Sequence, residues 1–490
     1  MKVILQNLIF NSDITGDNNL YYRMSGEVEE QENVIVLYQN TIISTDTYMN
    51  VFDYVFWKEH TIVDKVSFFI KLKGKGHIQI CSGLKEEKIL LEKFFSEESF
   101  QNIELELPET EKEKEIYFRI ISDGHTKIES AYFFTHIDPV FLRKIHLSIV
   151  ICTFHREKML LHNLNKLEKS RFFNPDSELY QKMSIRVIDN GSEILFDNTK
   201  LCKIFYNSNT GGSGGFARGI EESVKEEKKF GITHIVLMDD DVEFINETFY
   251  RLYALLQLLH KKYEKRAIGG RMFRKDRPYI QYTALEIWNG GNIIHIQNNM
   301  DMREKSNLYN INAVQGDYTG WWFGCFPFEF CKDNRPLPFF LHCDDVEYGL
   351  RQGLTPLVLN GIQVWHETSD YRQKPVVSYY DTRNSMIVNT VYEVFSDYRE
   401  VLPYWRQRIG FFCAQKKYLL EYAAIIALFD FMKGYDFFLT QQQKKEISKK
   451  NSKMLHIEVI VLWRIAALIY QIKGKKAFIS YDKLKEKRKR

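Results

Sequence analysis

Short apolar runs recur along the first 143 positions of this 490-residue chain, at residues 34–38, 66–72, 77–80 and 116–120. Turns rich in Gly, Asp, Lys and Glu separate these runs, a pattern typical of antiparallel strands. We therefore predict an N-terminal β-sandwich or jelly-roll domain over residues 1–143. No catalytic group of residues stands out there, so the domain is either a carbohydrate-binding module or a packing partner.

From Ile145 onward the pattern changes to apolar strands that alternate with helices. Such alternation predicts a mostly parallel sheet with right-handed crossovers, over residues 144–380. Ligands bind beyond the carboxyl ends of strands in such sheets, so polar residues at those ends are the candidates for chemistry. Strands are predicted at 146–152, 185–188, 203–206 and 235–238, with one helix ending near Lys169 and another over 215–229.

Beyond Tyr380 the apolar-rich segments 384–396, 403–440 and 454–472 predict a helical C-terminal domain over residues 381–490. The last of these segments contains Glu458 and Arg464, which fits an interfacial or core helix better than a membrane span. The residues that follow it are strongly basic. This tail either holds the protein to an anionic membrane surface or only keeps it soluble.

Composition narrows the class of protein. A net charge of +3 is too small to argue for a nucleic-acid partner, and the aromatic content of 14% fits a protein that binds sugars or interfaces. The N-terminus lacks a secretory apolar region, and no uncharged apolar run reaches the length of a membrane span. Seven cysteines without metal-like spacing indicate reduced thiols. We therefore expect a cytoplasmic protein, either monomeric or homo-oligomeric.

Three consecutive aspartates, Asp239, Asp240 and Asp241, follow the predicted strand at 235–238. Like charges so close together are costly without a cation, and Asp239 and Asp241 point the same way on an extended segment. Both can therefore hold one divalent ion, which would in turn hold the diphosphate of a nucleotide sugar. A solvated acidic loop is the alternative. His366 ends another strand and would complement the pair, although a lone histidine is usually structural.

Other strand ends carry groups that suit a nucleotide. Arg156, just after the first strand, can fork onto an anion, while Asp189 and Asn190 could read a uracil edge or a ribose. Asp-Asn-Gly is, however, also a common turn. The segment from Asn209 to Gly219 has four glycines in five positions. Those glycines let backbone approach a ligand and expose N–H groups ahead of a helix, without matching a dinucleotide or P-loop motif.

A second acidic pair, Asp344 and Asp345, opens a predicted helix. Either carboxylate could accept the proton of an attacking hydroxyl, with Glu347 and Arg351 fixing the local geometry. The alternative is an ordinary helix N-cap with an acidic first turn. Upstream, the pair Trp321-Trp322 lies between glycines and is either a sugar-stacking platform or buried packing.

The order of these motifs resembles that of the bacterial galactofuranosyltransferases of the mycobacterial galactan-polymerase type, over most of the chain. The resemblance implies an α/β fold, with a glycosyltransferase A-type (Rossmann-like, mixed-sheet) core between the N-terminal β-sandwich and the helical C-terminal region. It also implies an inverting transferase that uses UDP-galactofuranose and Mn²⁺ or Mg²⁺. The matching motifs are Thr153-Phe154-x-Arg156, the glycine segment, Asp239-Asp240-Asp241, Trp321-Trp322, Asp344-Asp345-x-Glu347-Tyr348-Gly349-x-Arg351 and Trp365-His366.

The same resemblance assigns expected roles. Asp345 would be the general base, and Glu286 would touch sugar hydroxyls. Asp344, Trp321 and Trp322 would line the acceptor site. The metal ligands would be Asp239, Asp241 and His366. The nucleotide contacts would be Thr153, Arg156, Asp189, Asn190, Asn209, Gly211, Gly212 and Asp239. Tyr379-Tyr380-x-x-Arg383-Asn384 also echoes the family and is expected near the pocket, without an assigned role.

We therefore expect a transferase on the inner face of the cell membrane that extends a lipid-linked cell-envelope or capsular glycan. One alternative is a related transferase that uses UDP-galactopyranose or dTDP-rhamnose, because the metal and phosphate parts are shared across the fold. The other is an inactive glycan-binding protein, against which the retention of both acidic clusters and of His366 speaks.

Overall fold

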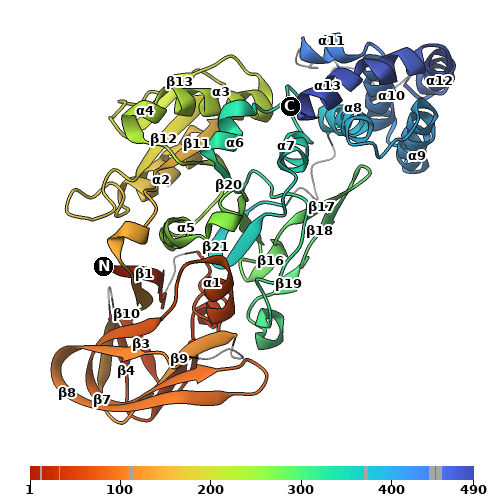
Figure 1. The fold of residues 1–490 in the computed structure, drawn as a ribbon. Coiled ribbons are helices and arrows are strands. Elements are labelled where there is room, and N and C mark those ends of the chain that lie inside the picture. Colours follow the sequence, from red (N-terminus) through yellow and green to blue (C-terminus); the bar gives the residue numbers. More distant parts are fainter. Residues whose placement is uncertain are drawn as a thin grey trace.

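A computed structural model describes residues 1–10, 14–31, 34–109, 114–368, 374–440, 447 and 455–489. Figure 1 shows a β-rich N-terminal region at one end of the molecule, a mixed α/β region in the middle and helices at the other end. The predicted fold class, an α/β core flanked by β-rich and helical regions, is confirmed.

The N-terminal strands form one branched sheet of ten strands. The strands are β1 (Lys2–Asn7), β2 (Arg23–Ser25), β3 (Val28–Gln31), β4 (Val34–Leu37), β5 (Thr41–Ser44), β6 (Phe52–Asp53), β7 (Ser67–Ser82), β8 (Lys88–Glu106), β9 (Glu115–Ser122) and β10 (Thr126–His136), and the helix α1 (Tyr54–His60) follows β6. The predicted strands at 66–72 and 77–80 are one strand, β7, which pairs first with β10 and then with β9. Phe118 of β9 and Phe133 of β10 both pack against Phe68, with ring centroids 5.1 and 5.3 Å away. The two branches therefore enclose one core.

The central sheet has nine strands, and its first four, in the order β13-β12-β11-β14, are parallel as predicted. The antiparallel strand β20 then lies between β14 and β15, and β21 pairs with β15 in parallel, so the sheet is mixed. The strands are β11 (Leu147–Thr153), β12 (Met183–Asp189), β13 (Cys202–Tyr206), β14 (His234–Asp239), β15 (Ile268–Arg274), β16 (Ile280–Thr283), β19 (Met300–Asp301), β20 (Phe323–Pro327) and β21 (Leu357–His366), with a separate hairpin of β17 (Glu286–Asn289) and β18 (Asn292–His295).

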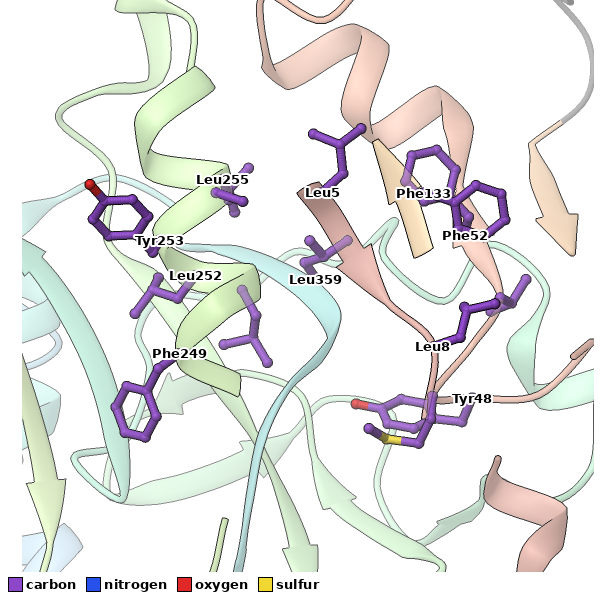
Figure 2. Close-up of a cluster of buried hydrophobic side chains, with 14 of the residues drawn as sticks. Leu5, Leu8, Tyr48, Phe52, Phe133, Phe249, Leu252, Tyr253, Leu255 and Leu359 are labelled. Atoms are coloured by element: carbon purple, nitrogen blue, oxygen red, sulfur yellow. The ribbon is translucent and has the colours of Figure 1, made fainter. Parts of the chain in front are cut away.

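Helices cover this sheet and join it to the N-terminal region. They are α2 (Glu157–Glu168), α3 (Gly211–Lys225), α4 (Glu227–Phe230), α5 (Glu247–Leu258), α6 (Phe328–Asp333) and α7 (Asp344–Gln352). Figure 2 shows apolar side chains of β1 and α5 in one cluster, among them Leu5 and Leu252. Beside it, the buried Glu247 of α5 accepts hydrogen bonds from the backbone and side chain of Asn7. The β-rich and central regions therefore share a core.

The C-terminal region is helical, as predicted. The expected segment 403–440 consists of three helices, and the first C-terminal helix begins at Pro375, so the predicted boundary after residue 380 falls inside it. Among the described helices, none has both the length and the apolar character that crossing a bilayer requires. The helices are α8 (Pro375–Val391), α9 (Val401–Ala414), α10 (Tyr418–Phe431), α11 (Tyr435–Leu439), α12 (Leu455–Ser480) and α13 (Asp482–Lys489).

Candidate active site

The carboxyl ends of the parallel strands meet at one edge of the central sheet. Asp239 of β14 pairs in register with Cys152 of β11, and Thr153 of β11 pairs with Asp189 of β12. This register follows from the buried apolar runs that precede each polar residue, because parallel strands buried on both faces are almost continuously apolar. The sheet thus places three of the predicted groups side by side.

Asp239, Asp241 and His366 form a candidate cation site. One ligand atom of each lies within 4.8 Å of the other two. His366 Nε2 is 2.9 Å from Asp241 Oδ1 and 3.7 Å from Asp239 Oδ2. Two carboxylates and an imidazole are a donor set that suits Mn²⁺ or Mg²⁺, so the residues fit the ion that the sequence analysis predicts.

The protonation of these three groups reflects crowding of charge. Burial raises the pKa of Asp239 to about 7. Burial also acts on Asp241, but the hydrogen bond from His366 and the charges of His366 and Arg156 outweigh it and hold the pKa of Asp241 at about 2. Burial disfavours the charged imidazole, yet its hydrogen bond to Asp241 and the two carboxylate charges raise the pKa of His366. The negative charge of the group is thus balanced by His366, Arg156 and protonation of Asp239, and a divalent ion would balance it as well.

The middle aspartate has a different task. Asp240 accepts hydrogen bonds from Thr153 Oγ1 at 2.7 Å and from Arg156 Nη1 at 2.8 Å. The same Arg156 nitrogen lies 2.7 Å from Asp241 Oδ2. Thr153 and Arg156, both predicted as nucleotide contacts, thus hold the aspartate segment in place. Since 38% of the Arg156 side-chain surface stays exposed, the guanidinium can still reach an anion.

Backbone pairing brings His366 to the aspartates. The amide of Glu243 donates to the carbonyl of Trp365, and the amide of Trp365 donates to the carbonyl of Glu243, both at 2.8 Å. Lys275 adds a hydrogen bond from its Nζ to the carbonyl of Asp241. These contacts fix the segment after the aspartates against the end of β21. No local sequence pattern predicts these contacts.

The glycine segment is helical from Gly211 onward, although the sequence predicts a loop as far as residue 214. Close packing explains the glycines, since a Cβ at Gly215 would lie 2.1 Å from Cys152 Sγ and one at Gly219 would lie 2.1 Å from Val150 Cγ1. Helix α3 therefore lies directly on β11. Thr210 at its N-cap makes no side-chain capping bond, and Asn209 Oδ1 accepts from the first helical amide, that of Gly211, instead.

That end of α3 faces the second acidic pair. A Cβ at Gly212 would lie 3.7 Å from Asp344 Oδ2, and Gly211, with φ +73°, sits against the carbonyl of Phe340. Asn209, whose Oδ1 accepts from the Gly211 amide at 3.0 Å, lines a neighbouring cavity of about 470 Å³. Gly211 and Gly212 thus lie beside the second acidic pair and the loop that precedes it.

Asp189 and Asn190 are built into the turn after β12. Asp189 accepts hydrogen bonds from the backbone amides of Gly191, Glu193 and Ile194, at 2.8 to 2.9 Å. Asn190 donates to the carbonyl of Gly211 at 3.0 Å. Both side chains are almost fully buried, so they shape the floor of the site and join the β12 turn to α3.

Asp344 and Asp345 open α7 as half-buried groups. Burial and the charge of Glu286 raise the pKa of Asp345 to about 6. Burial and then the charge of Asp345 raise the pKa of Asp344 well above its ordinary value. Glu347 and Arg351, which were expected to fix the geometry of this helix, form an ion pair in which Arg351 Nη2 lies 2.6 Å from Glu347 Oε2. A carboxylate with a pKa near 6 is well suited to accept a proton at neutral pH.

The loop before α7 is strained and is held by the C-terminal region. Phe340, His342 and Cys343 all have positive φ, at +74°, +61° and +63°, which is unfavourable for residues other than glycine. Asn384 Nδ2 lies 2.7 to 3.2 Å from the carbonyls of Phe339, Leu341 and His342. Arg383 donates to Asn384 Oδ1 and to the Phe339 carbonyl, so this pair clamps the loop that presents Asp344 and Asp345.

Glu286 lies at the start of the β17–β18 hairpin and is buried. It accepts a hydrogen bond from His295 Nδ1 at 2.7 Å, and the Tyr282 hydroxyl lies 3.0 Å from His295 Nε2. Burial raises the pKa of Glu286. Its charge acts on Asp345, which places it near the second acidic pair. Sequence patterns did not point to His295 or Tyr282.

The two tryptophans differ in their surroundings. Trp321 is only 5% exposed and packs edge-on against Phe216 of α3 and Tyr348 of α7, so it sets the spacing of the two helices that carry the site. Trp322 is half-buried, and its Nε1 donates to the carbonyl of Gly270 at 2.8 Å. Trp321 is therefore in a buried packing environment, one of the two alternatives for the pair, while Trp322 keeps some exposed surface.

Comparison with known proteins relates both described domains to one group of enzymes. Residues 17–136 match the family Galactofuranosyltransferase 2 N-terminal, and residues 148–325 match Glycosyl transferase family 2. Galactofuranosyltransferase GlfT2 of Mycolicibacterium smegmatis is 22% identical over 391 residues, 71% of this chain and 57% of that protein. GlfT2 of Mycobacterium tuberculosis is 23% identical over 385 residues, 71% and 58% respectively. The chain thus spans less than three fifths of the length of these relatives.

Solved structures align only loosely with the chain. The mannosyltransferase PcManGT from Pyrobaculum calidifontis, in complex with GDP-Man and Mn²⁺, has a TM-score of 0.31 and 9% identity over 68% of this chain and 88% of that one. CsCBM6-3 from Clostridium stercorarium, in complex with cellobiose, has a TM-score of 0.17 and 11% identity over 23% of this chain and 85% of that one. The sequence matches carry the comparison: they support a glycosyltransferase whose two matched regions are similar to galactofuranosyltransferases of the GlfT2 type.

Proposed function

We propose that the protein transfers galactofuranose from UDP-galactofuranose to a hydroxyl of a growing, lipid-linked cell-surface glycan, with inversion of the anomeric carbon. One observation carries the proposal. A set of potential metal-ligating side chains at the end of β14 and a carboxylate pair with raised pKa values at the start of α7 lie near each other, since the charge of Asp239 acts on Asp344. A donor diphosphate and an acceptor hydroxyl need such separate but adjacent sites.

The donor side of the site is the edge of the central sheet. Asp239, Asp241 and His366 would hold Mn²⁺ or Mg²⁺, which neutralises the charge that develops on the leaving diphosphate. Arg156 and the N-terminus of α3 add fixed positive charge beside it. Thr153, Asp189, Asn190 and Asn209 define the walls into which the nucleoside fits.

The acceptor side is the start of α7. Asp345 accepts the proton of the attacking hydroxyl as that oxygen bonds to the anomeric carbon and the bond to UDP breaks. One displacement inverts that carbon, so no covalent bond to the protein forms. Asp344, Trp322 and Glu286 orient the acceptor sugar, and Trp321 supports them by holding α7 against α3.

The protein is further proposed to act on the inner face of the cell membrane. Val461, Ile465, Leu468, Ile472 and Ile479 of α12 are exposed and recur at a spacing that places them on one face of the helix. Arg464, Lys475 and Lys476 flank that face on the helical wheel. An apolar stripe with basic flanks is typical of a helix that lies in an anionic membrane surface.

Purified protein incubated with UDP-galactofuranose, Mn²⁺ and a galactoside should release UDP and lengthen the acceptor, and chelation by EDTA should stop the reaction. UDP-galactopyranose and dTDP-rhamnose serve as competing donors. Transfer from either of these, with none from UDP-galactofuranose, would contradict the proposed donor. UDP binding that needs Mn²⁺, measured by calorimetry, without transfer from any donor, would favour a glycan-binding protein instead.

The membrane proposal has its own test. Vesicles of anionic phosphatidylglycerol should carry the protein upward in flotation, and neutral phosphatidylcholine vesicles should not. Replacing Leu468 and Ile472 by serine should abolish flotation without changing transfer to a water-soluble galactoside. Flotation of the double variant at the wild-type level would contradict this role of α12.

A further inference from the structure

We propose that a groove between α9 and the β17–β18 hairpin is a second carbohydrate subsite, which holds sugars of the acceptor chain behind the one that reacts. The inference rests on the proposed transferase function and extends its acceptor site. The groove has a volume of about 310 Å³. It is lined by Asn292 of the hairpin and by Tyr404, Gln407, Arg408, Phe411 and Phe412 of α9.

The groove combines aromatic rings with neutral hydrogen-bonding groups. Phe411 is 57% exposed, and its ring meets Phe412 edge-on at 5.8 Å. The carboxamides of Gln407 and Asn292 are exposed beside it. A sugar presents an apolar face of C–H groups and a rim of hydroxyls, so it can stack on the ring of Phe411 while the two carboxamides bind the rim.

The charge of the groove favours a neutral ligand. Arg408 is the single charged residue among its lining residues, and it pairs with Asp381 of α8. Its Nη1 lies 3.4 Å from the Tyr404 hydroxyl, and its buried Nε has no hydrogen-bond partner among the described residues. A buried donor without a partner is costly unless a ligand satisfies it. A polyol offers an acceptor for it, whereas an anion gains little from a guanidinium that Asp381 already neutralises.

The groove is connected to the surroundings of the second acidic pair through the hairpin and through α8. The hairpin begins at Glu286, whose charge acts on Asp345, and Asn292 pairs with Asn289, three residues further along β17. Three residues of strand span about 10 Å, which is the length of a short oligosaccharide. At the other side, the charge of Asp381 acts on Cys343, the residue before Asp344.

The groove is also preformed. Gly291, at the hairpin turn with φ +106°, lies so close to α9 that a Cβ there would be 2.2 Å from the Tyr404 hydroxyl oxygen. Trp288 and Asn389 join the same hairpin to α8, through a hydrogen bond of 2.9 Å. A rigid groove binds a flexible chain with less loss of entropy than a mobile one.

The test compares a disaccharide and a hexasaccharide of galactofuranose as acceptors for the full-length protein and for Phe411→Ala and Gln407→Ala. Each variant should raise the KM of the hexasaccharide about ten times more than that of the disaccharide, with little change in kcat. Phe141→Ala, which removes another phenylalanine that is 65% exposed, is the matched control and should alter neither constant.

Equal effects on both acceptors, or no effect on the hexasaccharide, would overturn the subsite. If the variants raised the KM only of an acceptor that carries an alkyl chain, the groove would be a lipid site, and this result would also overturn the carbohydrate subsite. Saturation-transfer NMR with the hexasaccharide alone, without donor or metal, measures binding independently of transfer, so it tests the subsite separately from the transferase proposal. Binding that Phe411→Ala abolishes supports the subsite even if no transfer is found, and absence of any binding contradicts it.

Discussion

The two acidic clusters of the site are built in opposite ways. Asp239, Asp240 and Asp241 end a buried strand and are surrounded by Arg156, His366 and Lys275, so most of their charge is compensated. Asp344 and Asp345 begin a helix behind a strained loop, and within the described residues neither forms an ion pair. In the first cluster the charges of His366 and Arg156 keep the pKa of Asp241 low, while burial raises the pKa of Asp239; in the second cluster burial raises the pKa of both aspartates.

The two clusters also differ in the parts of the structure that hold them in place. The backbone of the central sheet positions the first, through strand register and the pairing of Glu243 with Trp365. Side chains of the C-terminal region position the second, through Arg383 and Asn384. The central sheet therefore positions the proposed donor side, while the helical region completes the proposed acceptor side. Substitutions in one cluster should therefore have effects that substitutions in the other do not.

The largest effect is expected from Asp345→Asn. Loss of the proton acceptor should lower kcat by about 10²- to 10⁴-fold, since general bases contribute that much. Calorimetric titration with UDP and Mn²⁺ should give the wild-type affinity, because the donor side is untouched. If UDP binding fell along with kcat, the two clusters would not be independent.

Asp241→Asn should affect the opposite side. It removes one proposed metal ligand and the hydrogen-bond partner of His366. Mn²⁺-dependent UDP binding should therefore weaken by about 100-fold or more, since loss of a residue that only hydrogen-bonds to a metal ligand already costs about 10- to 100-fold. Asp276→Asn, an exposed aspartate that pairs with Arg274, is the matched control and should leave UDP binding unchanged. Wild-type binding in Asp241→Asn would remove this residue from the cation site.

Asn384→Ala should loosen only the acceptor side. The carbonyls of Leu341 and His342 lose this donor, while the carbonyl of Phe339 keeps Arg383, so the free energy of unfolding should fall by about 1–3 kcal/mol. Displacement of Asp345 should lower kcat by about 10- to 100-fold. Thermal melts and steady-state kinetics measure the two effects. A destabilised variant with normal kcat would show that the clamp serves stability alone.

The smallest effect concerns pH. Asp345 accepts a proton only when ionised, so kcat/KM should fall as the pH drops through about 6, by about tenfold per pH unit below it. Glu286→Gln removes a like charge near Asp345 and should move this acidic limb to lower pH. A pH–rate profile of the variant with an unshifted limb would show that Glu286 does not tune the base.

Local patterns sufficed to predict the strand-end carboxylates. Asp239 and Asp241 follow an apolar run whose length and position define a buried strand, and the parallel sheet then fixes where they lie. The predicted convergence of His366 on them, by contrast, came from family resemblance. Its physical cause, the pairing of residue 365 with residue 243, joins segments more than a hundred positions apart. No local pattern encodes such a contact.

The helical start of the glycine segment could not be predicted from local patterns, and neither could the role of the Arg383-Asn384 pair, which the family resemblance placed near the pocket without a role. Glycine is a poor helix former, so the sequence favours a loop, but packing of Gly215 and Gly219 on β11 outweighs that preference. Asn384 looks like any polar residue in a helix. Only the folded chain reveals that its amide group meets the carbonyls of a loop some forty residues earlier.

The reciprocal amide bonds between Glu243 and Trp365 have a consequence for how the enzyme handles its ion. Because main-chain atoms hold the segments that carry Asp241 and His366 together, these side chains and Asp239 already converge in the folded chain. If they bind a divalent ion as proposed, loading and release of that ion would require no refolding. Occupancy would thus follow the ambient concentration of divalent cations.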